Sequence, residues 1–240
     1  AAHAFDMVGA QADCPKGAIR EHPVRTNQSA APQGNRLLNL LSTADLDLLR
    51  PYLHSVALDY KLQLYEAGQP IPYVYFPITG VASLVSTMSD GFAAEVGTIG
   101  NEGVVGLPII LGDVVAPNSI YVQVPGAGLR LKSGEFRDAL AQSASLRHVM
   151  LRYAHAFFNQ VAQTAACVHF HTIQQRCCRW LLMTHDRAQS DQFILTQEFL
   201  GMMLGVQRSC VTLVASKLKR RHLIDYSLFN APVTVNLGPV

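Results

Sequence analysis

The chain has 240 residues, of which 49% are hydrophobic and 15% are charged, and its formal net charge is +2. This length and composition are sufficient for a buried core and indicate one large or two modest domains. The longest apolar run, Val104 to Leu111, is interrupted by glycine and proline, which argues against a membrane span. The five cysteines do not form a secreted disulfide framework, so we expect a reducing, cytoplasmic location.

The small net charge hides an asymmetry along the chain. From Gln174 onwards there are eight Lys or Arg residues and four Asp or Glu residues, a net charge of +4, so the preceding part carries −2. A basic C-terminal part fits a nucleic-acid-binding module joined to a second unit.

The first two segments differ in pattern. Residues 1–34 mix small and polar residues without an amphipathic period and are predicted to be a flexible tail. From 35 to 144, short apolar runs alternate with glycine and proline, which predicts a β-roll or barrel. The expected strands are 62–65, 74–76, 81–85, 95–98 and 120–124, and helices are expected at 43–53 and 133–142.

The segment 145–169 is predicted to be one long helix. Its apolar side chains recur at steps of three and four residues, close to the seam spacing of a two-stranded coiled coil. We therefore expect a dimerisation helix. The alternative is that the stripe packs only onto the roll. The expected seam residues are Leu146, Met150, Tyr153, Phe157 and Val161.

Residues 197–224 have the pattern of a short helix, a turn and a second helix. Thr196 can cap the first helix, and Gly205 can adopt the left-handed conformation that ends it. The second helix, 207–219, has an apolar side and a polar side. In a helix-turn-helix, side chains at the start of the second helix reach base edges. An ordinary helical hairpin is the alternative for this spacing.

Candidate DNA contacts follow from this pattern. Arg208 is the main candidate for base contact because its guanidinium can donate two parallel hydrogen bonds to guanine. A turn at Leu228–Pro232 and a strand at Val233–Val235 would add a wing. The candidates for base contact are Gln207, Arg208, Ser209 and Thr212, and those for phosphate contact are Thr196, Lys217, Lys219, Arg220 and Arg221.

These residues resemble the CRP/FNR transcription regulators over most of the chain. Arg176–Leu182 resembles the family's R-x-x-R-W-L-L helix, and Gly205–Ile224 follows its G-x-S-R-x-T-V-x-x-x-L-x-x-L-x-x-x-x-L-I pattern without a gap. In the N-terminal part, Tyr75–Pro77 with Gly80 resembles the v-f-f-i-x-x-G hairpin of the cyclic-nucleotide-binding roll. Gly100–Gly106 resembles the approach to its phosphate cassette.

The resemblance implies an α+β fold with three parts. These are a cyclic-nucleotide-binding-like β-roll (35–144), a long dimerisation helix (145–169) and a winged helix-turn-helix (170–240). It implies a sequence-specific transcription regulator that binds palindromic double-stranded DNA as a homodimer. RNA polymerase is a further candidate partner, and no membrane is expected to be involved.

Two departures from the family pattern qualify this expectation. The catabolite activator's glutamate and second base-reading arginine are replaced by Ser209 and Leu213, so we expect a different half-site. The family's phosphate cassette contains the stretches F-G-E-L and R-S/T-A, whose glutamate and arginine contact the ribose and the phosphate. At the corresponding places this chain has Val105–Pro108 and Ala116–Ser119, which contain neither residue. A phosphate buried there would be unpaired, so we expect an unknown effector other than cyclic AMP (cAMP) and no cofactor.

Other classes of site are weaker in the sequence. Cys177 and Cys178 lack the C-x-x-C spacing of structural zinc, so no metal site is expected. Cys210, at the start of the second helix, is a candidate for redox control. A Cys/His enzyme, with Cys178 or Cys210 beside His185, lacks a recognisable nucleophile elbow, so the chain is not expected to be an enzyme. A ligand-independent regulator remains a further alternative.

Overall fold

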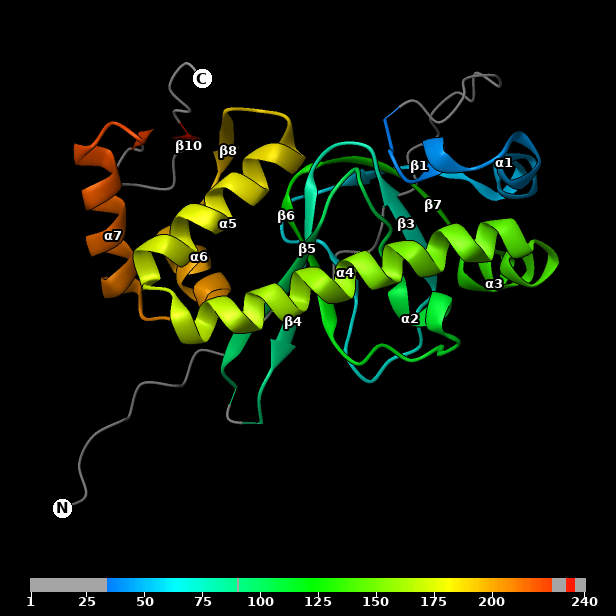
Figure 1. The fold of residues 1–240 in the computed structure, drawn as a ribbon, viewed down its shortest axis with the longest axis horizontal. Coiled ribbons are helices and arrows are strands. Elements are labelled where there is room, and N and C mark those ends of the chain that lie inside the picture. The colour runs from blue at the N-terminus through cyan, green and yellow to red at the C-terminus, as the bar shows by residue number, and fades with distance from the viewer. Residues whose placement is uncertain (1–33, 90, 226–231, 236–240) are drawn as a thin grey trace.

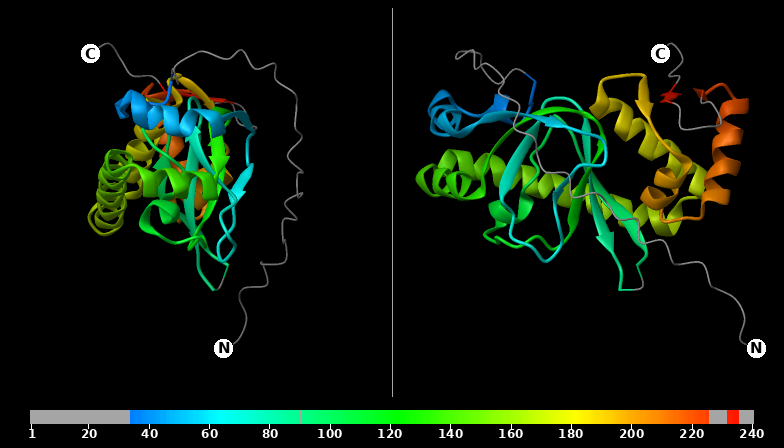
Figure 2. Two further views of the ribbon diagram at one scale, coloured as in Figure 1. Left: turned by 90° about the vertical axis from the view of Figure 1, so that its right-hand side faces the viewer. Right: turned by 180° about the vertical axis from the view of Figure 1, so that it is seen from behind.

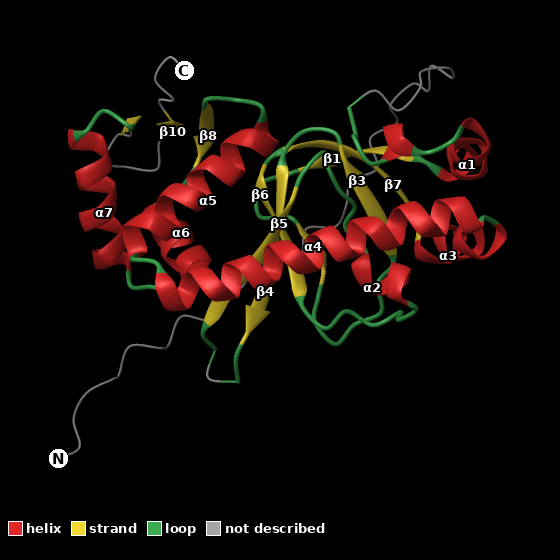
Figure 3. Cartoon of the chain, in the orientation of Figure 1, coloured by secondary structure: helices red, strands yellow, loops and turns green. Residues whose placement is uncertain are grey.

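The computed structural model describes residues 34–89, 91–225 and 232–235 (Figure 1). The predicted tail therefore lies outside the described residues except for Gly34, and so does the predicted wing turn apart from Pro232. The described chain has an α+β fold, as expected. An N-terminal β-roll is followed by one long helix and a C-terminal helix-turn-helix (Figure 3).

The roll consists of two antiparallel sheets. One sheet has the order β1-β7-β3 and the other β2-β6-β4-β5. Each predicted strand is present, with its ends moved by no more than two residues. The strands are β1 (His54–Leu58), β2 (Gln63–Tyr65), β3 (Tyr73–Pro77), β4 (Val81–Thr87), β5 (Ala93–Ile99), β6 (Ser119–Val124) and β7 (Gly126–Lys132).

β1 and β7 were not predicted from the sequence. β1 is mostly exposed and carries His54 and Ser55, so it lacks a clear apolar run. β7 begins with two glycines in three residues, which resembles a turn. The first of them, Gly126, is needed for close approach, since a Cβ there would lie 2.3 Å from the Thr79 carbonyl oxygen. Tertiary packing thus stabilises β7 as a strand, although its glycine-rich start indicates a loop.

Short helices flank the roll. They are η1 (Leu38–Leu40), α1 (Thr43–Leu49), η2 (Arg50–Tyr52), α2 (Leu107–Leu111) and α3 (Ser133–Gln142). The Ser42 hydroxyl accepts a hydrogen bond from the Asp45 amide (3.2 Å) and so caps α1. The predicted helix 43–53 is divided in two because Pro51 has no amide hydrogen to continue the α-helical ladder.

The long helix α4 (Ala144–Phe170) crosses the roll (Figure 2). Its close approach depends on Gly103, where a Cβ would lie 2.3 Å from the Tyr153 hydroxyl oxygen. The expectation that the predicted seam faces a second chain is wrong, because this stripe forms part of the protomer's own core. Leu146, Met150, Tyr153 and Phe157 are buried against the roll, and Val161 is half-buried beside them.

The described C-terminal part, residues 171–225 and 232–235, contains three helices and a small sheet. The helices are α5 (Ile173–Ala188), α6 (Gln197–Leu204) and α7 (Arg208–Arg220). The sheet has the order β8-β10-β9, formed by β8 (Gln192–Ile194), β9 (Ile224–Asp225) and β10 (Pro232–Val235). The predicted wing strand is thus present as β10, and it also pairs with the unpredicted strand β8.

Two residues of α4 test which side of the helix packs on the roll. Phe157 is 6% exposed, whereas Asn159 is an exposed residue. We expect Phe157→Ala to lower the free energy of unfolding by about 3–5 kcal/mol, because it leaves a cavity in the core. Asn159→Ala should change it far less. Chemical denaturation measures both, and equal losses would contradict this orientation of α4.

Candidate nucleic-acid interface

The axes of α6 and α7 are bent by 108° relative to each other. Thr196 caps α6 as expected, since its hydroxyl accepts a hydrogen bond from the Phe199 amide (3.0 Å). Gly205 ends the helix with φ 62°, the left-handed conformation predicted for it. The Val206 amide then donates to the Gly201 carbonyl (2.9 Å), which fixes the turn between the two helices.

The apolar side of α7 holds it in the C-terminal core. Val211, Val214, Ala215 and Leu218 are buried, with Leu218 only 1% exposed. Trp180 and Leu181 of α5 belong to the same core. Arg176 donates a hydrogen bond to the Leu204 carbonyl at the end of α6. The stretch Arg176–Leu182 therefore supports α6 and α7 from behind and leaves the other side of α7 uncovered.

The four predicted base-contact residues lie together at the start of α7. Gln207 is the N-cap residue, and Gln207, Arg208, Ser209 and Thr212 are all exposed. The Thr212 hydroxyl lies 2.8 Å from Gln197 Oε1 and 3.1 Å from the Arg208 carbonyl oxygen. Gln197 was not predicted as part of this surface. Its only sequence signal is its place directly after the capping Thr196.

The predicted phosphate-contact residues are divided between two places. Lys217, Arg220 and Arg221 line a hollow together with Gln174 of α5, which no sequence pattern indicated. Lys219 forms an ion pair with Asp225 (Nζ to Oδ1, 2.9 Å). Thr196 lies apart from the hollow, at the start of α6, where it is half-buried. The hollow therefore brings three positive charges together at the C-terminal end of α7.

Apolar contacts join the C-terminal part to the roll. Val81 and Val85 of β4 and Val124 of β6 belong to the same buried cluster as Trp180 and Leu181. At the edge of this cluster, the rings of Tyr60 and Phe199 lie 6.3 Å apart. The two parts are thus packed against each other.

Glu95 of β5 is at the centre of the polar contacts in this interface. Its Oε1 accepts a hydrogen bond from the Trp180 indole nitrogen (2.8 Å), and its Oε2 lies 2.6 Å from the Ser83 hydroxyl oxygen. The same hydroxyl is also within hydrogen-bonding distance of the side-chain amide oxygen of Gln123. The amide nitrogen of Gln123 donates a hydrogen bond to Thr184 Oγ1 (2.9 Å). The chain of contacts therefore runs from the roll to α5.

These contacts are satisfied when Glu95 is protonated. The Ser83 hydroxyl has one proton and can donate to only one of its two acceptors. A neutral Glu95 supplies the second proton by donating to Ser83, which then donates to Gln123. Burial raises the pKa of Glu95 to about 8, against the opposing effects of its hydrogen bonds and of the charges of Arg187 and Arg179.

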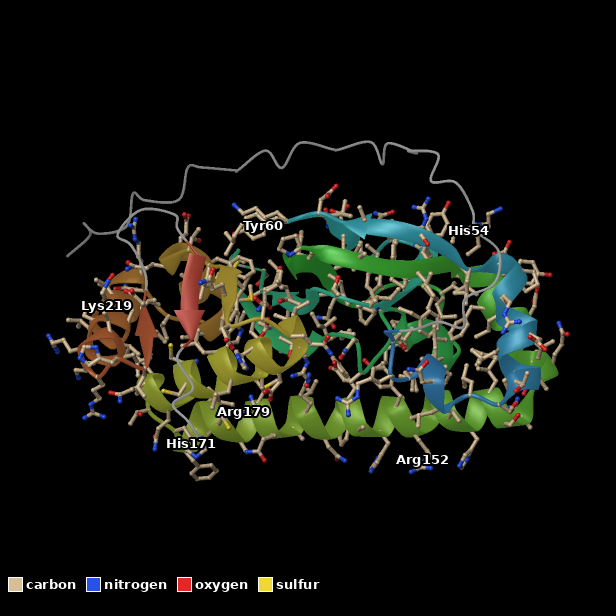
Figure 4. All side chains as sticks on the ribbon, turned by 90° about the horizontal axis from the view of Figure 1, so that it is seen from above. His54, Tyr60, Arg152, His171, Arg179 and Lys219 are labelled. Carbon is tan, nitrogen blue, oxygen red and sulfur yellow. The ribbon has the colours of Figure 1, made fainter. Side chains whose placement is uncertain are left out.

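A second group of polar contacts joins the roll, α4 and α5. Arg187 donates from Nε to Glu102 Oε1 (2.7 Å) and from Nη2 to Gln160 Oε1 (2.7 Å). Gln160 in turn donates to the Thr98 carbonyl (2.9 Å). Arg179, labelled in Figure 4, donates to Thr164 of α4 (3.3 Å). The position of α5 is therefore fixed against both the roll and the long helix.

The cassette region of the roll is apolar in the structure. Leu107 begins α2, and Ile109, Ile110 and Ala116 are buried. Between residues 105 and 119 the only charged side chain is that of Asp113, which is exposed. This region therefore offers no cation to a phosphate group.

The cysteines differ in their surroundings. Cys177 is buried, and burial raises the pKa of its thiol to about 12; burial also raises the pKa of Cys178. Raised pKa values oppose the thiolate form that a nucleophile needs. Cys210 is half-buried at the start of α7. Among the described residues, no three His, Cys, Asp or Glu side chains are placed to hold a metal ion.

No single helix in the described part of the chain is long and apolar enough to cross a membrane. Only α6 and α7 taken together meet that length and composition, and they are strongly bent at their junction.

Comparisons with known proteins agree with this geometry. Residues 175–235 match the family of Crp-like helix-turn-helix domains. FixK2 from Bradyrhizobium japonicum has a similar structure, with 16% identity, a TM-score of 0.64 and coverage of 77% of this chain and 92% of that chain. So does a Eubacterium rectale protein described as a transcriptional regulator of the crp/fnr family, with 14% identity, a TM-score of 0.65 and coverage of 83% and 93%.

A third similar structure is that of the c-di-GMP responsive global regulator CLP from Xanthomonas campestris. Its identity is 14%, its TM-score is 0.62, and the coverage is 81% of this chain and 100% of that chain. At these identities the likeness establishes the fold. No match was found among curated protein sequences.

The proton on Glu95 gives a testable pH dependence of stability. Between its ordinary pKa of 4.5 and the folded value of about 8, the unfolded chain loses this proton while the folded chain keeps it. Stability should therefore fall as pH rises through this window, by at most about 1.4 kcal/mol per unit. Glu95→Gln keeps one donor and one acceptor and should remove this contribution.

Denaturation of both proteins from pH 5 to pH 8 measures the effect. The exposed Glu66→Gln is the matched control. Parallel pH profiles for the wild type and Glu95→Gln would show that Glu95 is not protonated in the folded chain.

Proposed function

We propose that the protein is a sequence-specific DNA-binding transcription regulator, because residues 175–235 match the family of Crp-like helix-turn-helix domains and the chain has the fold of the CRP/FNR structures described above. The observation that carries the proposal is the uncovered polar side of α7. Arg208 lies in its first turn, exposed, while the opposite side of the helix is anchored in the core.

The positively charged side chains of α7 are suited to binding double-stranded DNA. Arg208 enters the major groove and contacts guanine, with Gln207, Ser209 and Thr212 beside it. Lys217, Arg220 and Arg221, gathered at the hollow, contact phosphates and release counterions, so binding weakens as salt rises. Thr196 and Lys219 are further phosphate contacts in this proposal.

We propose that the protein binds DNA as a homodimer through the outer side of α4. This side carries its own stripe at steps of three and four residues, and the neighbouring Arg152 points away from the roll (Figure 4). Leu151 is 45% exposed and Phe158 is 67% exposed, with no cover within the described chain. The stripe consists of His148, Leu151, His155, Phe158, Ala162 and Ala165.

A twofold axis along α4 would place two copies of α7 on one face of a duplex. Half-sites about one helical turn apart, ~34 Å, then make a palindromic operator. RNA polymerase is a candidate partner of the bound dimer, and the cytoplasm is the compartment that fits a DNA-binding protein with reduced cysteines.

The effector proposed here is not cyclic AMP, because no basic side chain lies between residues 105 and 119. Two alternatives keep the function as a DNA-binding regulator but change its control. The protein could act without a ligand, or it could be controlled by oxidation of Cys210, which lies beside the proposed DNA surface. A Cys/His enzyme is disfavoured by the raised pKa of Cys178.

Loss of the Arg208 side chain should weaken specific binding about tenfold or more, because two hydrogen bonds to guanine disappear. The measurement is a gel shift with genomic DNA fragments in the presence of non-specific competitor. Arg137→Ala, which removes the same charge from the exposed surface of α3, is the matched control and should have little effect. Equal losses in the two variants would rule out Arg208 as the base reader.

Two alanines on α4 test the dimer. Ala162 lies on the outer stripe, whereas Ala156, also exposed, lies roughly 120° around the helix from its centre. Ala162→Glu should dissociate the dimer, since it places two like charges at the twofold axis, and Ala156→Glu should not. Sedimentation measures both. A dimer that survives Ala162→Glu, or a monomeric wild type, would contradict the proposal.

A further inference from the structure

Leu213 is the apolar residue on the otherwise polar surface of α7. It is 66% exposed, although its neighbours Val214 and Ala215 are buried in the core. It lies one helical turn after Ser209 and next to Thr212. Its side chain is therefore presented on the same side as the residues assigned to base contact.

An exposed leucine is ordinary on a protein surface and needs no explanation by itself. Here it lies on the side of the helix that the proposed function places in the major groove. The groove edge of a base pair offers hydrogen-bonding groups and one apolar group, the C5-methyl of thymine. A leucine in this place can contact that methyl, whereas it leaves the donors and acceptors of a base unpaired.

We propose that Leu213 selects thymine in each half-site by packing on its C5-methyl group. The inference rests on the proposed function and names the base that this part of α7 reads.

The other residues on this side of α7 are suited to different contacts. Arg208 provides two donors for guanine. The hydroxyl of Thr212 lies within hydrogen-bonding distance of Gln197 and of the Arg208 carbonyl, so its proton is used within the protein. Leu213 has no polar atom in its side chain to be satisfied in this way, and its exposed surface is the apolar one that a methyl group fits.

The spacing along α7 locates the thymine relative to the guanine. Leu213 follows Arg208 by five residues, which is ~7.5 Å along the helix axis. Base pairs are stacked ~3.4 Å apart, so the thymine should lie about two base pairs from the guanine that Arg208 contacts.

Deoxyuridine provides a direct probe, because it pairs like thymidine and differs only by the missing methyl. In DNA selected by the purified protein, each thymine is replaced in turn by deoxyuridine, and the Kd of the full-length protein is measured. At one position in each half-site the wild type should lose about fourfold in affinity, the effect of burying one methyl group. Elsewhere the replacement should have no effect.

Leu213→Ala should bind thymine and deoxyuridine equally at that position, while Leu111→Ala, which removes a similarly exposed leucine from α2 of the roll, should keep the wild-type difference. Because Leu213 is exposed, Leu213→Ala is expected to fold, and circular dichroism checks this. The inference is overturned if the wild type is insensitive to the methyl at every position, or if Leu213→Ala keeps the difference. In both cases DNA binding itself persists, so the proposed function stands; absence of any specific DNA binding would overturn both.

Discussion

The packing of the C-terminal helices on the roll is the constraint on which the rest of the structure depends. Apolar residues from β4, β6, α5, α6 and α7 form one buried cluster. Within this interface the carboxyl of Glu95 contacts Trp180, and Arg187 links Glu102 to Gln160 of α4. Because buried polar groups are costly unless each has a partner, these contacts define one relative position of the two parts. That position determines where α7 lies relative to the long helix.

The long helix has two apolar sides with different roles. The inner side closes the core of the roll, where Met150 is fully buried. The outer side carries exposed Leu151 and Phe158 and is the side that we assign to the dimer. Since α5 is fixed to α4 and to the roll, a twofold axis along α4 determines the separation of the two copies of α7.

Local signals in the sequence predicted the two helices of the helix-turn-helix and the turn between them. Thr196 caps α6, Gly205 has the left-handed conformation, and the buried side of α7 is the predicted one. The stripe on α4 was assigned to the wrong partner because heptad spacing occurs on both sides of the helix, and spacing does not say which side faces the roll. Glu95 had no signal at all, since its partners Ser83 and Trp180 are distant in sequence. The glycine-rich strand β7 is likewise fixed by tertiary contacts rather than by its own composition.

The central claim is that two copies of α7 read one symmetric site. Selection of random DNA by the full-length protein, followed by sequencing of the recovered fragments, tests this most directly. The account predicts two inverted half-sites whose centres are about 10 base pairs apart, each with a guanine. Recovery of no enriched sequence, or of a single half-site without symmetry, would contradict it.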